Sequence, residues 1–107
     1  MAIGLIIGVV VLIGVVGGLD RDAPRLASIA RAAGHEVEAH TGTLSATRVA
    51  GLRSLVARAD LILVLTDVNS HGAVQLARRL AREHQRPLHL MRRFGISQFT
   101  AFVRNAA

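Results

Sequence analysis

Hydrophobic and polar positions along the chain alternate between a helical period and a strand period. Asp22 and Pro24 are typical of a helix start, and Gly34 is typical of a helix stop. Between them, Leu26 and Ile29 fall at helical spacing. By the same reasoning, helices are predicted over residues 22–34, 45–58, 70–84 and 97–105, and strands over residues 9–16, 35–40, 60–66 and 87–91. This alternation predicts an α/β domain: a small doubly wound parallel sheet of about four strands with flanking helices, Rossmann-like or flavodoxin-like.

The predicted strands differ in how deeply they should be buried. Residues 61–65 are five consecutive aliphatic residues, which is typical of a strand covered on both faces of a parallel sheet. Residues 35–40 alternate between polar and apolar side chains, so we expect a half-exposed strand at an edge of the sheet. Residues 9–16 are expected to form the first strand, at the centre of the sheet.

The first 19 residues carry no charge, and a stretch of that length could span a bilayer. Five glycines and many β-branched residues in it favour strand over helix, and no basic residue precedes it as in a signal peptide. We therefore expect a cytoplasmic protein, with a membrane-associated N-terminus as the alternative. Residues 1–8 form an apolar extension, residues 9–107 form one domain, and a homo-oligomer through residues 1–16 would cover the apolar surface.

Composition narrows the chemistry that is open to the chain. It has 107 residues, enough for one domain, and no cysteine, which excludes disulfides and thiolate metal sites. All 13 basic residues are arginine, so lysine chemistry is excluded, and the formal net charge is +6. Because the arginines are dispersed and the only aromatic residues are three phenylalanines, we expect weak binding of nucleic acid without sequence preference.

Polar residues concentrate where the predicted strands end. In open parallel sheets, ligands bind outside the carboxyl ends of the strands. Two consecutive glycines there permit a tight turn and close approach of backbone amides to a ligand, and the arginines suit phosphate, carboxylate or propionate groups. The candidate ligand-binding residues are Gly17, Gly18, Asp20, Arg21, Asp67, Ser70, His71, Arg93 and Ser97.

His71 is the sharpest candidate for chemistry. It is expected in the first turn of a helix behind the cap residue Ser70 or Asn69, where the helix dipole favours the neutral imidazole. A neutral ring nitrogen can accept a proton or bind a metal, and His40 ends another strand on the same side of the sheet. These two histidines are therefore the candidate metal or haem ligands. The sequence contains no nucleophile elbow and no HExxH motif.

The interpretation that accounts for most of these residues is a non-catalytic module that binds a small anionic ligand or cofactor and forms homo-oligomers. One alternative is a haem- or metal-binding protein in which His71 is the ligand. A second is a small hydrolase-like enzyme in which His71 is the general base and Asp67 or Asp20 orients it.

Three groups of residues resemble a known bacterial family, the one called domain of unknown function 2325. They are Gly17 and Gly18 after the first strand, Thr66, Asp67, Ser70 and His71 after the third, and Arg93, Gly95, Ser97 and Phe99 after the fourth. The resemblance covers about residues 9–105. It implies a small Rossmann-like sheet domain with these residues gathered at one edge. Family members often carry a cysteine near the Asp-to-His loop, where this chain has Val68.

Overall fold

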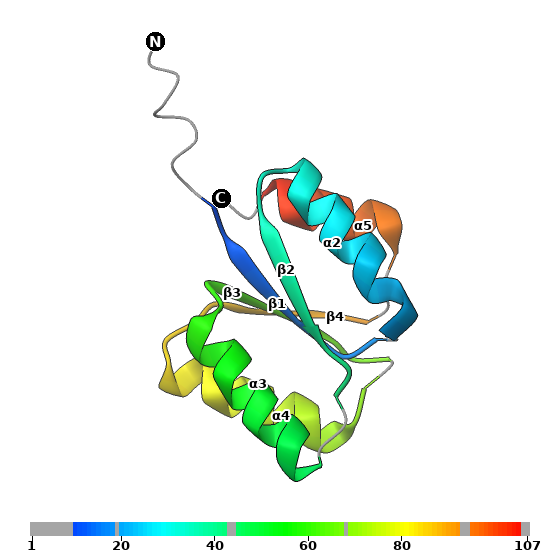
Figure 1. Cartoon of the computed structure of the whole chain (residues 1–107). Helices are drawn as coiled ribbons and strands as arrows, with labels where there is room; N and C mark the ends of the chain where they lie inside the picture. Colours follow the sequence, from blue (N-terminus) through cyan, green and yellow to red (C-terminus); the bar gives the residue numbers. More distant parts are fainter. Residues whose placement is uncertain (1–9, 19, 43–44, 68, 93–94, 106–107) are drawn as a thin grey trace.

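The computed structural model describes residues 10–18, 20–42, 45–67, 69–92 and 95–105, which form a four-stranded parallel sheet with helices on both faces (Figure 1). The elements are β1 (Leu12–Val16), the 3-10 helix η1 (Asp20–Asp22), α2 (Ala23–Ala32), β2 (Glu36–His40), α3 (Ala46–Arg58), β3 (Leu61–Leu65), α4 (His71–Glu83), β4 (Leu88–Met91) and α5 (Ile96–Arg104). The predicted α/β class, parallel sheet and number of strands are confirmed.

The strand order is β2-β1-β3-β4, and each neighbouring pair is parallel. Ile13 of β1 pairs with Val37 on one side and with Leu61 on the other, so β1 is the central strand that the sequence predicted. All five residues of β3 are buried, as expected for the aliphatic run. β2 lies at an edge and is mostly exposed, as its alternating pattern predicted.

Each face of the sheet has its own hydrophobic core. Helices α2 and α5 cover one face, where Ile13, Leu63 and Phe99 are fully buried. Helices α3 and α4 cover the other face, where Leu52 and Ile62 are fully buried. Successive residues of a strand point to opposite faces, which is why the continuous aliphatic run of β3 supplies both cores.

The first strand is shorter than the prediction of residues 9–16, because side chains replace backbone partners at its start. The backbone N–H of Val11 donates to Nδ1 of His35 at 3.1 Å, and that of Leu12 donates to Oδ2 of Asp60 at 2.9 Å. Val10 is outside the strand and 58% exposed. The predicted extension, residues 1–8, lies outside the described residues. No helix in the described part of the chain combines the length and apolar character needed to cross a bilayer.

Charge protects the β2 edge of the sheet. Glu38 of β2 accepts two hydrogen bonds from the guanidinium of Arg58 at the end of α3, at 2.6 and 2.8 Å. These bonds lower the pKa of the Glu38 carboxyl and raise the pKa of Arg58. Both side chains remain about half exposed, so water screens the pair and its contribution to stability is small. A charged edge strand also discourages pairing with another sheet.

Candidate functional site

The strand order places a topological switch point at the carboxyl ends of the neighbouring strands β1 and β3. The chain leaves β1 toward α2 on one face of the sheet and leaves β3 toward α4 on the other face. The two loops therefore part from each other between neighbouring strands. In doubly wound sheets this switch point is where ligands bind, because the parting loops leave a crevice.

Gly17 and Gly18 lie at the switch point, directly after β1. Their φ angles are 105° and 89°, values that side-chain-bearing residues rarely adopt. The Gly17 N–H donates to the carbonyl of His40 at 2.6 Å, which ties this loop to the end of β2. A Cβ at Gly18 would lie 3.2 Å from Cδ1 of Leu65, so the loop passes close over the end of β3.

Asn69 ties the two sides of the switch point together. Its Nδ2 donates to the carbonyl of Val16, the last residue of β1, at 3.2 Å and to that of Leu65, the last residue of β3, at 2.8 Å. Its Oδ1 accepts from the N–H of Ser70 at 2.9 Å. One side chain thus satisfies backbone groups that the ends of both strands leave unpaired.

Ser70 links the same loop to the end of β2. Its Oγ accepts from the N–H of Ala73 at 3.1 Å, which confirms the predicted helix cap, and donates to the carbonyl of Gly42 at 2.7 Å. Gly42 has a φ of 90°, and a Cβ there would overlap the side chain of Asn69. Only glycine fits between these loops without displacing Asn69.

His71 is the first residue of α4, as predicted, and its side chain is exposed at this edge. The side-chain amide of Gln75, one turn further on, donates to its Nε2 at 3.0 Å. An imidazole that accepts at Nε2 carries its ring proton on Nδ1. A metal or haem iron at Nε2 would have to displace Gln75, an exposed and flexible partner.

His40 has a structural role that differs from the expected one. Its ring is buried, Nδ1 accepts from the N–H of Gly42 at 3.0 Å, and Nε2 donates to the carbonyl of Arg48 at 2.7 Å. Both nitrogens are therefore used to hold the loop between β2 and α3. Among the described residues, no group of three or more His, Asp or Glu side chains is arranged to hold a metal ion.

The charged candidates are only partly described. Arg21 and Asp67 are exposed at this edge, and the exposed Ser97 lies in the first turn of α5. The Asp67 N–H donates to the carbonyl of Arg92 at 2.8 Å, which places the exposed Arg92 beside the β3 loop. Arg93 and the side chain of Asp20 lie outside the described part of the structure.

Helix polarity adds to the positive potential at this edge. All four α-helices that the structure describes begin after a strand, at the carboxyl edge of the sheet, and none carries an acidic residue in its first turn. The N-caps of α3, α4 and α5 are uncharged as well, whereas the N-cap of α2 is the acidic Asp22, which offsets the partial positive charge of that helix. Two of these helices, α2 and α4, start on either side of the switch point.

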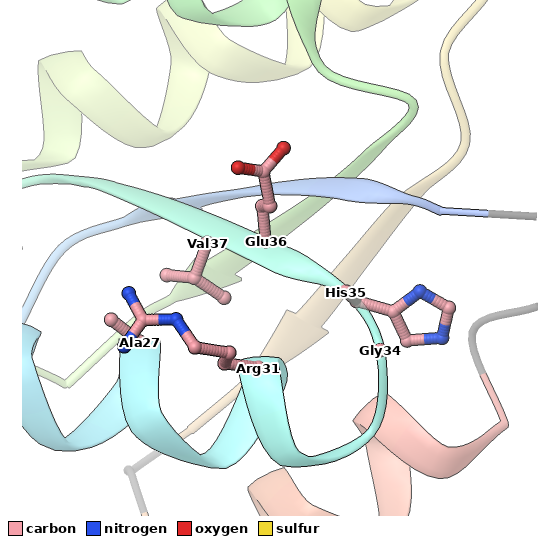
Figure 2. Close-up of a pocket in the computed structure, with 6 residues that line it drawn as sticks. All are labelled: Ala27, Arg31, Gly34, His35, Glu36 and Val37. Carbon is pink, nitrogen blue, oxygen red and sulfur yellow. The ribbon is translucent and has the colours of Figure 1, made fainter.

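The described surface has a pocket away from the switch point. It has a volume of about 330 Å³ and sits between α2 and the start of β2, at the amino edge of the sheet (Figure 2). Arg31 and Val37 face it, whereas the His35 ring and the Glu36 carboxylate point away. We assign the site to the carboxyl edge instead, because only there do loops and helix N-termini converge.

Sequence reasoning offered Asn69 only as an alternative helix cap and did not predict that Asn69, Gly42 and His40 join the loops. Each acts through contacts between loops that are distant in the sequence, such as Ser70 with Gly42. The available signal was local: an asparagine directly before a serine cap at the end of a buried strand. Side chains of that type are well suited to satisfying backbone groups at strand ends.

The strand order and the helix layers on both faces of the sheet define a small doubly wound α/β domain. The match to a family model over residues 12–106 shows that the chain belongs to the family described as uncharacterized protein conserved in bacteria (DUF2325). The resemblance noted from the sequence is thereby confirmed. Neither the curated proteins nor the solved structures contain a match.

Proposed function

We propose that this domain is a non-catalytic binding module that holds a small anionic ligand or cofactor at the switch point between β1 and β3. The observation that carries this proposal is the pair of glycines with positive φ, Gly17 and Gly18, directly after the central strand. Without side chains, their backbone can approach a ligand closely. The N-terminus of α4, whose cap residue Ser70 is uncharged, and the exposed Arg21 and Arg92 favour negative charge on that ligand.

Asp67 and His71 would then contact the polar, non-anionic part of the ligand. Both are exposed in the segment that follows β3 at the switch point. His71 carries a proton on Nδ1 when Gln75 donates to Nε2. Asn69 and Ser70 hold the loop rather than the ligand, because their polar atoms bind backbone groups. A rigid loop lowers the entropic cost of binding.

Gly18→Ala and Gly34→Ala provide a matched test. Both glycines have positive φ, 89° and 83°, so each substitution should cost about 1–2 kcal/mol of stability from backbone strain, to which Gly18→Ala adds a 3.2 Å contact with Cδ1 of Leu65. Gly34 lies at the amino edge of the sheet, away from the switch point. We expect Gly18→Ala to weaken binding of inorganic phosphate by about tenfold, equivalent to about 1.4 kcal/mol, and Gly34→Ala to leave it unchanged.

Amide shifts in nuclear magnetic resonance spectra during a phosphate titration would measure both affinity and position. The proposal predicts that the largest shifts fall on Gly17, Gly18 and the first turn of α4. Equal weakening by the two alanine variants would contradict it. So would shifts spread over the arginines of the helix surfaces, because they would indicate nonspecific ion pairing.

The alternative is that His71 is a haem or metal ligand. His71 is a better candidate than His40, because the His71 ring is exposed at the switch point, whereas both ring nitrogens of His40 bind backbone groups. The exposed ring makes few contacts, so His71→Ala should change the free energy of unfolding by about 1 kcal/mol or less. Haem added to the wild-type protein would then give a Soret band that the variant lacks. If the wild type gives no band, or the variant gives the same band, His71 is not a haem ligand.

The proposal also states that the chain forms homo-oligomers and that it is not an enzyme. The segment before β1 is proposed to contact a second copy, and Val10, next to that segment, is 58% exposed. Residues 12–16 cannot share in this contact, because β2 and β3 flank β1 and helices cover both its faces. For an enzyme with His71 as general base, Nε2 of His71 is hydrogen-bonded to the Gln75 amide and not to a hydroxyl group, so the binding module is preferred.

A further inference from the structure

The helix layer formed by α3 and α4 concentrates positive charge. These two helices lie side by side on one face of the sheet. They carry six of the 13 arginines of the chain and one acidic residue, Glu83. The six arginines are dispersed in the sequence but share this layer in the fold. All six side chains are exposed.

The densest part of this charge is the arginine stripe of α4, which consists of Arg78, Arg79 and Arg82. Arg78 and Arg82 are four residues apart, and Arg79 and Arg82 are three apart, so their side chains are neighbours on the helix surface. Arg79 has a long ion pair with Glu83, at 3.9 Å. Among the described residues, Arg78 and Arg82 have no acidic partner.

Like charges at this spacing repel each other, and within the described part of the chain no acidic side chain is paired with Arg78 or Arg82. A polyanion that lies along the helix would relieve it and would release its own counterions. Arginine also suits phosphate in particular, because the planar guanidinium donates two parallel hydrogen bonds to it.

We propose that the arginine stripe of α4 binds the phosphate backbone of nucleic acid without reading its sequence. A membrane surface fits less well, because an interfacial helix needs a free apolar face. The apolar face of α4, including Ala77 and Leu80, is already buried against the sheet. The large hydrophobic side chains that are exposed in the described structure, Val10, Leu90 and Ile96, all lie outside α3 and α4.

This surface is separate from the proposed ligand site. The stripe begins two helical turns after His71 and leads away from the carboxyl edge of the sheet. Backbone binding also agrees with the composition of the chain, which lacks tryptophan and tyrosine for base stacking. The two proposals therefore stand or fall independently.

The test compares two double variants that remove the same charge. Arg78→Gln/Arg82→Gln changes the stripe, whereas Arg25→Gln/Arg31→Gln changes exposed arginines on α2, on the opposite face. Binding of a labelled DNA duplex of about 20 base pairs is measured by fluorescence anisotropy over a range of salt concentrations. Circular dichroism verifies that each variant is folded, which is expected because all four side chains are exposed.

We expect the stripe variant to bind roughly tenfold more weakly than wild type near 50 mM salt and the α2 variant to stay within about twofold. The slope of log affinity against log salt should become shallower by about 2 in the stripe variant, since each lost phosphate contact removes about 0.9. Equal losses in the two variants would overturn the proposal, because net charge alone would then explain binding. Absence of duplex binding by wild type at low salt would also overturn it, as would a stripe-dependent preference for phosphatidylserine vesicles over the duplex.

Discussion

Replacing Phe99 with alanine is expected to lower the free energy of unfolding by about 3–5 kcal/mol, the largest loss we expect from any single truncation in this protein. The Phe99 side chain of α5 is fully buried in the core shared with α2 and the sheet. Its ring also stacks on that of Phe102, with centroids 6.5 Å apart. Small domains are typically stable by only about 5–15 kcal/mol, so a large part of the stability would be lost.

Urea unfolding followed by circular dichroism would measure this change. Phe99→Leu is the matched control, because leucine fills much of the same space, and its expected loss is smaller, about 1–2 kcal/mol. If both variants unfold at the wild-type urea concentration, α5 does not contribute to the core as described. Phosphate binding by Phe99→Leu should be retained, since Phe99 is buried beneath α5 and not at the switch point.

Replacing Asn69 with alanine is expected to cost about 2–3 kcal/mol of stability. The variant loses three hydrogen bonds and leaves the carbonyls of Val16 and Leu65 without their side-chain donor. A partly buried acceptor that loses its partner carries a penalty beyond the bond itself. The loops after β1 and β3 would then be less firmly joined, and phosphate affinity should fall as well.

Asn105→Ala is the control for the asparagine substitution. The Asn105 side chain makes a single exposed hydrogen bond, to the carbonyl of Ala101 at 2.9 Å, so its loss should cost about 0.5 kcal/mol or less. Chemical denaturation of both variants gives the comparison. An Asn69→Ala variant as stable as Asn105→Ala would show that the switch point does not depend on this side chain.

The periodic pattern predicted the element order well because burial in this fold follows sequence spacing. The aliphatic run of β3 is buried throughout, and the alternating strand β2 is mostly exposed. In α4, the apolar residues at helical spacing are the ones that are buried. The start of β1 was predicted too early, because Val10 and Val11 precede the strand. The backbone at the start of β1 bonds to the side chains of His35 and Asp60, which lie there because β2 and β3 pair with β1.

The position of the candidate site was also predictable, for a topological reason. Loops that follow parallel strands must share one edge of the sheet, so Gly17 and His71 were expected at the same edge before any contact was known. The role of His40 was not predictable. Its buried ring binds Gly42 and Arg48, and a histidine at a strand end has the same sequence signal whether it holds a loop or a ligand.

Periodicity, composition and turn residues were enough to establish the α/β class, the central and buried strands, a helix cap at Ser70 or Asn69 and the absence of thiol and lysine chemistry. These properties depend on the spacing and identity of residues that are near one another in the chain. The joining of the loops by Asn69, the commitment of His40 to backbone groups and the gathering of arginines on α3 and α4 depend on strand order. Strand order brings distant segments into contact, and local sequence patterns carry no information about the partners that such contacts create.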